Sequence, residues 1–460
     1  MKNNIKQAFL HLWEQTPALC ISIPVTLGSL FALEKILALF LFPLFLLTVA
    51  RAKIPQMTLL FLLPLPFIHI PDSSIEGKGT FIVDSISASK SHFKNGYCHR
   101  GRFSFDEKKK GCNLPCFVFA SEELSSFRTK AIVTPRNRGY LLITSEKENI
   151  DHFSLLKYRL KAKKWVKSYI QKRIKNREAA QFLIGIFAGE MEDKLMLSDF
   201  SKLGLTHLLA ISGLHFALIT LFFRKLLFFL PNKVSIVVLL FIVTTYYLFI
   251  GNSPSVQRAW IFTLLVYCGQ LFDRQGNALN TLGVALLIAT ILNPFSLLTL
   301  SFQLTFFATA GLILFYQPRK KPLKRVLQQS TLWQVGFICS TLLKRSFLLT
   351  AAVHLFILPL LLFRFHNFCP HTVFYNLFFP TMASLSLLLL LLGFIFPPLH
   401  ILNSYYTGAL LWIVENPPLL LPGLFFESVP LLIVIFLNLA ILTWGVHRRF
   451  SSKSLIFSGL

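Results

Sequence analysis

Acidic residues are scarce in this chain. Its 460 residues include 20 Asp and Glu against 46 Lys and Arg, which gives a formal net charge of +26. Charged residues make up only 14% of the sequence, whereas a soluble globular protein carries about 25%. Basic loops anchor membrane proteins on the cytoplasmic side. The excess here goes beyond that need, and it favours an anionic partner such as lipid headgroups or nucleic acid.

The sequence motifs of several common chemistries are missing. There is no G-x-x-x-x-G-K-[ST] nucleotide loop, no G-x-S-x-G elbow, and no H-E-x-x-H or H-x-H-x-D-H pattern among the twelve histidines. Asp and Glu are nearly absent from the apolar second half, so a carboxylate-driven proton pump is not indicated. We therefore expect a protein that is not an enzyme and that holds no metal or other cofactor.

Long apolar runs are abundant instead. Hydrophobic residues make up 54% of the chain, the mean hydropathy is +0.61, and apolar runs occupy 36–50, 234–250, 282–292 and 385–396. A bilayer crossing takes about 20 such residues. We predict an all-α, multi-pass protein of the cytoplasmic membrane with about 10 to 12 transmembrane helices. The first span is expected to stay uncleaved, because no signal-peptidase site follows it.

The character of the sequence divides the chain into five segments. We predict N-terminal transmembrane helices over 1–70, a small external β domain over 71–150, basic amphipathic helices over 151–206, a transmembrane channel domain over 207–446 and a cytoplasmic tail over 447–460. Short alternating stretches bounded by turn residues indicate the β domain, and its size suits an OB-like barrel. The number of crossings between 374 and 422 is ambiguous. The basic stretch at 157–177 lies either on anionic lipid or on nucleic acid.

Three of the seven cysteines, Cys98, Cys112 and Cys116, cluster in the predicted β domain. On an oxidising side of the membrane they could form one disulfide, with the pairing undecided. Zinc binding with His99 is an alternative, but the spacing matches no standard ligand pattern.

Polar residues interrupt the apolar second half at three places, and such residues usually face a protein interior or water. The first is 204–215. On one continuous helix, His207 and His215 share a face with Ser212 and Gly213 alongside. We expect the histidines to face a hydrated interior and Gly213 to lie at a helix contact; plain helix packing is the alternative.

The other two places are 251–259 and 293–306. Arg258 opens a predicted span, where it is either an interfacial anchor or a pore cation. Gln303 lies in the middle of a span, where its amide needs a hydrogen-bonding partner.

These segments together resemble the channel domain of the ComEC family of DNA-uptake competence proteins. The resemblance rests on GLTHLLAISGLH at 204–215, PSVQRA at 254–259, NP at 293–294, SFQLTF at 301–306 and a later Asn376-x3-Pro380, in that order. It covers roughly 180–400. The β domain fits the family's external OB-like domain by position alone.

The resemblance implies a channel that passes single-stranded DNA inward through the membrane. His207, Ser212, Gly213, His215, Arg258 and Gln303 are the residues that the family motifs place along the DNA path. Many relatives carry a metallo-β-lactamase-like domain after the channel, and this chain reaches Leu460 without one. The DNA receptor and the driving ATPase or nuclease are therefore expected from separate proteins. Whether the chain forms a homo-oligomer stays open.

Two other classes of function fit the apolar composition. One is a transporter of small solutes or lipids on a similar helical scaffold, which inverted repeats would favour. The other is a membrane-embedded enzyme acting on lipid-linked substrates, which a carboxylate or metal cluster would favour. We find neither feature in the sequence.

The basic loops before the β domain bracket an odd number of predicted crossings, which places this domain outside the cytoplasm. A topology reporter fused near Asn95 is expected to score as external. A cytoplasmic signal from that fusion would reverse the orientation.

Overall fold

The computed structural model describes most of the chain. The described residues are 16–33, 74–89, 96–106, 114–120, 127–136, 139–149, 155–191, 193–251, 253–274, 277–315, 332–365, 367–368, 370–418, 424–425, 436–438, 440–441 and 444–445.

A five-stranded closed barrel forms the β domain. Its strands are β1 (Ile75–Ser89), β2 (Gly96–Phe105), β3 (Leu114–Ala120), β4 (Phe127–Arg136) and β5 (Gly139–Asn149). They follow the order β1-β2-β3-β5-β4, and β1 closes the barrel on β4. All pairs are antiparallel except β3 with β5. Five strands in this Greek-key order make an OB-like barrel, so the predicted small β domain is confirmed.

Alternate residues of the strands fill the barrel, as the period of two requires. Phe81, Phe103, Leu114, Phe127 and Val133 are fully buried there. Gly101 lets β1 pass close to β2, because an added Cβ would overlap the backbone of Ile82. Leu160 and Phe295, from outside the barrel, pack on this core.

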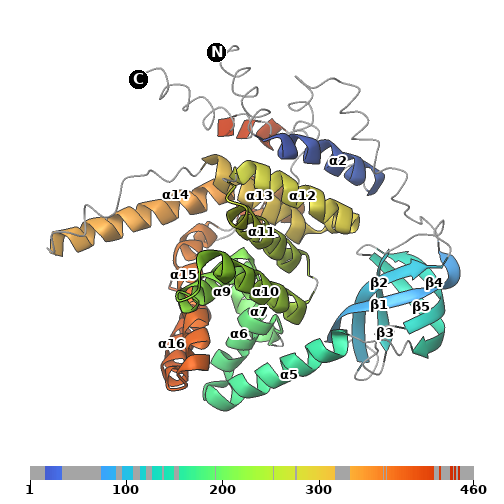
Figure 1. Cartoon of the computed structure of the whole chain (residues 1–460), viewed down its shortest axis with the longest axis horizontal. Coiled ribbons are helices and arrows are strands. Elements are labelled where there is room, and N and C mark those ends of the chain that lie inside the picture. Colours follow the sequence, from blue (N-terminus) through green and yellow to red (C-terminus); the bar gives the residue numbers. More distant parts are fainter. Residues whose placement is uncertain are drawn as a thin grey trace, which may run out of the picture.

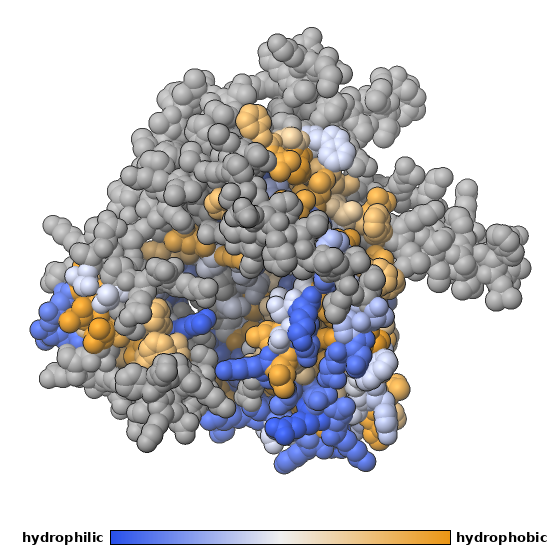
Figure 2. Space-filling view, turned by 180° about the vertical axis from the view of Figure 1, so that it is seen from behind, coloured by the Kyte–Doolittle hydropathy of each residue, from blue (hydrophilic) through white to orange (hydrophobic). Residues whose placement is uncertain are grey.

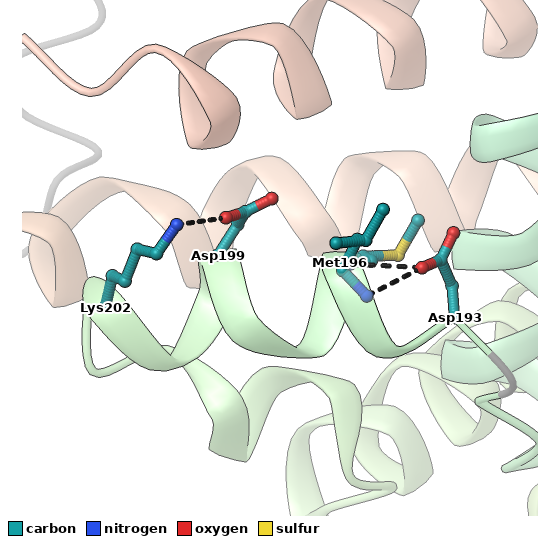
Figure 3. Close-up of polar contacts among 5 residues, drawn as sticks. Asp193, Met196, Asp199 and Lys202 are labelled. Atoms are coloured by element: carbon teal, nitrogen blue, oxygen red, sulfur yellow. Dashed lines mark hydrogen bonds and ion pairs between the residues drawn. The ribbon is translucent and has the colours of Figure 1, made fainter.

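Helix α5 (Leu155–Arg173) leaves the barrel and runs along the helical body (Figure 1). It is followed by α6 (Arg177–Ala188) and α7 (Lys194–Lys202). Asn176 caps α6, and Asp193 caps α7 by accepting bonds from the amides of Leu195 and Met196 at 2.9 and 3.2 Å (Figure 3). Hydrophilic residues gather over the lower part of the molecule, where Figure 1 places α5 (Figure 2).

The remaining helices form the apolar body. They are α2 (Pro17–Leu33), α8 (Thr206–Leu209), α9 (Gly213–Leu226), α10 (Asn232–Ile250), α11 (Pro254–Leu271), α12 (Ala278–Leu292), the 3-10 helix η3 (Pro294–Leu298), α13 (Leu300–Phe315), α14 (Leu332–Phe365), α15 (His371–Ile395) and α16 (Leu399–Glu415). The short strands β6 (Asn367–Phe368) and β7 (Leu424–Phe425) pair with each other. The protein is thus mostly helical with one small barrel.

Two of the described helices, α10 and α15, are long and apolar enough to cross a membrane. Both are only 33% buried over that stretch, so much of their apolar surface faces outward. Shorter apolar helices cover 17–29, 278–292, 300–315 and 347–363. The predicted 10 to 12 spans are not reached by the described residues, and that number stays a prediction.

A close helix contact forms between α2 and α12. A Cβ added at Gly283 would overlap the backbone of Ala18 and Leu19, and Asn280 accepts a bond from the Ala18 amide at 2.9 Å. Small residues permit this close approach of helices. The sequence placed such a contact at Gly213 instead, and that prediction was wrong. Gly213 is exposed, and no described residue lies within 4 Å of an added Cβ.

Substitution of Gly283 by Ala is expected to lower stability by about 1 to 3 kcal/mol, because the added methyl meets backbone that cannot turn away. The matched control is Gly213→Ala, which is expected to leave stability unchanged or to raise it slightly. Thermal unfolding of the two purified variants in the same detergent measures the difference. Equal melting temperatures would contradict the assignment of the contact to Gly283.

Candidate functional site

A groove of about 860 Å³ lies between the barrel and the helical body. Strands β2 and β3 form one wall, and the first half of α5 forms a second. Gly189 and Glu190 also line it, and the opposite side comes from residues at three helix junctions: 209–211, 251 with 253–256, and 293–299. Each of these segments belongs to one of the three polar motifs that the sequence singled out. The groove is therefore the place where the three motifs meet the barrel.

The barrel wall pairs arginines with aromatic rings. Arg100 and Arg102 lie two residues apart on β2, and therefore on the same side of that strand. On β3, Phe117 lies opposite Arg100, and Phe119 follows two residues later. The two phenylalanine rings meet edge to face at 5.9 Å. Together they give the groove an aromatic surface beside two guanidinium groups.

Helix α5 adds two more cations. The Nε of Arg159 donates to the Leu248 carbonyl at 2.8 Å. Its Nη1 would lie 3.0 Å from a Cβ at Gly251, whose φ of 108° also favours glycine. Lys163 pairs with Glu190 at 3.7 Å. Burial lowers the pKa of Lys163, while Glu190 acts in the opposite direction.

The electrostatics of the groove are strongly positive. Among the described residues, its lining includes Arg100, Arg102, Arg159 and Lys163, with Glu190 as the one carboxylate. The N-terminal ends of α11 and α13 also lie at the groove, since Ser253 and Thr299 immediately precede them and line it. Helix N-termini carry partial positive charge and unpaired amide donors. The groove can therefore bind an extended anion.

A buried arginine holds these two helix ends together. Arg258, in the second turn of α11, is only 1% exposed. Its Nη1 donates to the carbonyls of Ser301 and Phe302 at 2.7 and 2.6 Å, and its Nη2 donates to Thr305. The guanidinium also lies over the Phe302 and Phe306 rings, at 5.3 and 5.7 Å. The sequence had suggested an interfacial anchor or a pore cation. In this structure Arg258 is neither; it links α11 to α13.

Gln303 has a similar local role. Its Nε2 donates to the Leu297 carbonyl at 2.9 Å, which fixes the junction between η3 and α13. Its Oε1 is buried and has no hydrogen-bonding partner among the described residues. The hydrogen-bonding partner expected for this amide is therefore the backbone carbonyl of Leu297, which is close in the sequence.

The 204–215 element is two helices rather than one. Helix α8 ends at Leu209, Ala210 is extended, and Ser212 begins α9 as its N-cap. The His215 Nδ1 lies 3.1 Å from both the amide and the hydroxyl of Ser212. This is a capping box in which histidine takes the usual place of glutamate. The break occurs because Ser212 adopts extended backbone angles that a continuous helix would not allow.

The two histidines consequently differ in their surroundings. His215 is 7% exposed and caps α9, whereas His207, in α8, is exposed. The shared face predicted for them depended on an unbroken helix and was wrong. Ile211, between them, reaches Gly189 and packs in the same cluster as Ile250 and Val256. That cluster brings the first motif to the second.

Of the pairings left open for the predicted disulfide, the structure rules out the one between Cys98 and Cys116. Cys98 pairs with Phe119 and Cys116 pairs with Gly101 in the β2–β3 register, so the two are three positions apart. Cys116 is a buried free thiol, and burial raises its pKa to about 12. Cys112 lies outside the described residues. Among the described residues no three His, Cys, Asp or Glu side chains gather as a metal site requires.

The four basic residues that line the groove were not predicted from the sequence. Arg159 and Lys163 were hidden within a generally basic stretch, and Arg100 and Arg102 within a short strand. An alternation signal was present, since Arg100 and Arg102 face outward between the buried residues His99, Gly101 and Phe103. Only the docking of the barrel on the body shows that they line one groove with the motifs.

The family comparison covers the same body. Residues 189–448 match the family described as "Competence protein", which is more than half of the chain, and the chain belongs to this family. It is also 28% identical over 183 residues to "ComE operon protein 3" of Bacillus subtilis (strain 168). That match covers 39% of this chain and 21% of the relative, so the aligned part is about a fifth of that protein. No solved structure matches significantly.

The buried position of Arg258 predicts that Arg258→Ala destabilises the protein by about 3 kcal/mol, because hydrogen bonds and ring contacts are lost and a cavity remains. Arg258→Lys is expected to restore little of this, since an ammonium cannot reproduce the planar fork. Arg224→Ala serves as the control at an exposed arginine, with an expected effect under about 0.5 kcal/mol. Thermal unfolding in detergent measures all three. An Arg258→Ala protein of normal stability would contradict the role as a link.

Proposed function

We propose that this chain takes part in competence DNA uptake as a channel for single-stranded DNA in the cytoplasmic membrane, with the groove as its mouth. Family membership supports a role in competence DNA uptake. The observation that carries the finer proposal is that three family motifs and the barrel line one cationic groove.

Charge is the first support for DNA. Each nucleotide carries a phosphate, and its neutralisation by Arg or Lys releases bound counterions, which drives association. The groove offers Arg100, Arg102 and Arg159 beside the Lys163–Glu190 pair, and the partial positive charge at the N-termini of α11 and α13 adds to them. A polyanion approaching an apolar membrane needs such compensation, because unpaired charge is costly in a low dielectric.

Aromatic rings are the second support. Proteins that bind single strands without sequence preference place bases on aromatic faces while a basic groove follows the backbone. OB barrels use the face of strands 2 and 3 for this purpose. Phe117 and Phe119 lie on β3 of this barrel, and Arg100 and Arg102 lie on β2. The residue types and the strands both fit an unpaired nucleic acid strand.

The proposal includes a multi-pass membrane location with the barrel outside. The exposed apolar surface of α10 and α15 and the shorter apolar helices support a lipid environment. The proposal needs no catalytic step in this chain. We assign the capture of DNA, and the force or strand degradation that drives it inward, to separate proteins.

The groove predicts that Arg100→Gln with Arg102→Gln weakens the binding of single-stranded oligonucleotides. The slope of log K against log salt concentration should become less steep by about 1.4, because each phosphate contact to a single strand contributes about 0.7 to this slope. Fluorescence anisotropy of a labelled oligonucleotide, titrated with the detergent-solubilised protein at several salt concentrations, measures both effects.

The matched control removes the same charge from the barrel away from the groove. Lys78 and Arg128 are exposed on β1 and β4, and Arg128 pairs with Asp106 at 2.7 Å. Lys78→Gln with Arg128→Gln is expected to leave the slope nearly unchanged. Equal losses in the two double variants would show that overall charge, and not the groove, binds the DNA.

A further inference from the structure

A second pocket of about 490 Å³ lies on the other side of the helical body, between the turn from α5 to α6 and one face of α16. Arg173, Lys175 and Asn176 form its polar side, and Tyr405 and Trp412 are among the residues that α16 contributes. None of the described residues that line it is acidic. It shares no lining residue with the groove.

The polar side is arranged to donate hydrogen bonds. The Oδ1 of Asn176 is already used, because it accepts from the amides of Glu178 and Ala179 as the cap of α6. Its Nδ2 is left as a donor and would lie 3.1 Å from a Cβ at Gly408. Arg173 lies 5.8 Å from the Tyr169 ring, which holds it at the end of α5. Among the described residues neither Arg173 nor Lys175 forms an ion pair.

The apolar side remains unusually exposed. Tyr405 and Trp412 are 78% and 64% exposed, and Ile401 and Leu402 on the same helix are both more than half exposed. Tyr and Trp with Arg or Lys nearby are typical of the boundary between lipid tails and headgroups. Helix α16 is tied to the candidate span α15 through the buried hydrogen bonds of Ser386 and Asn403. The pocket therefore lies on the helix that packs against this candidate span.

We propose that this pocket binds the phosphate of an anionic phospholipid, with Arg173, Lys175 and Asn176 around the headgroup and the acyl chains along Tyr405 and Trp412. The charge selects an anion, and the exposed aromatic and aliphatic residues select a lipid over a free phosphate. The inference rests on the membrane location proposed above but not on DNA transport. A bound lipid at this position fixes the α5–α6 turn against α16.

The test uses the full chain. The protein is first exchanged into vesicles of phosphatidylcholine, or of equal parts phosphatidylcholine and phosphatidylglycerol, and is then purified from them in detergent. Native mass spectrometry then counts retained lipid. The wild-type protein is expected to retain phosphatidylglycerol in preference to phosphatidylcholine. Arg173→Gln with Lys175→Gln should reduce that preference about 30-fold, the factor that corresponds to about 1 kcal/mol for each of two basic residues near an anionic surface.

Two further variants separate the pocket from general charge. Lys161→Gln with Lys172→Gln removes the same charge from exposed positions of α5 outside the pocket, and it should keep the preference. Gly408→Leu leaves every charge in place but fills the space beside Asn176, so it should abolish the preference. Equal losses in the two charge variants, or full retention by Gly408→Leu, would overturn the proposal.

Inorganic phosphate provides the last arm. If inorganic phosphate binds at Arg173 and Lys175 but phosphatidylglycerol is not retained, the site binds free phosphate and the lipid assignment is wrong. Oligonucleotide binding is measured on the same preparations. If the wild-type protein binds DNA but shows no lipid preference, this inference fails and the proposed function stands. If it shows the lipid preference but does not bind DNA, the proposed function fails and this inference stands.

Discussion

The groove depends on one buried guanidinium. Arg258 leaves water entirely, and its charge is compensated by two carbonyls, a hydroxyl and two aromatic faces. These partners all belong to the first turns of α13, so the N-termini of α11 and α13 are held side by side. The segments just before those helices are the ones that line the groove. Burial of this charge costs several kcal/mol. The contacts that offset the cost also fix the positions of the two segments that precede α11 and α13.

The remaining walls are joined to that pair by apolar packing. Ile211, Ile250 and Val256 bring the break between α8 and α9 to the start of α11. Leu160 and Phe295 dock the barrel on α5 and η3. The cations of β2 and α5 then share the groove with the helix N-termini, and Glu190 is the one carboxylate among the described residues that line it. The packing of the apolar body and the position of the positive groove thus depend on the same few contacts.

The sequence predicted the classes of structure better than the contacts within them. Alternating strands predicted the small barrel, and the ordered motifs predicted the family. The roles of single residues were less accessible. Ser212 carried the signal of an N-cap, but the apolar run around it favoured one helix. Gly213 and Gly283 are indistinguishable as glycines in apolar helices, and only tertiary packing decides which one meets a neighbour. Arg258 was placed at a surface because its partners lie more than forty residues away.

We propose that single-stranded DNA lies in the groove between the barrel and the body. A photoreactive amino acid at Phe117, which lines the groove, tests this directly when compared with the same group at Ile132, which is 40% exposed elsewhere on the barrel. Illumination during uptake of labelled DNA is expected to attach the strand at position 117 and not at position 132. Attachment at neither position, or equal attachment at both, would show that the strand does not lie in the groove.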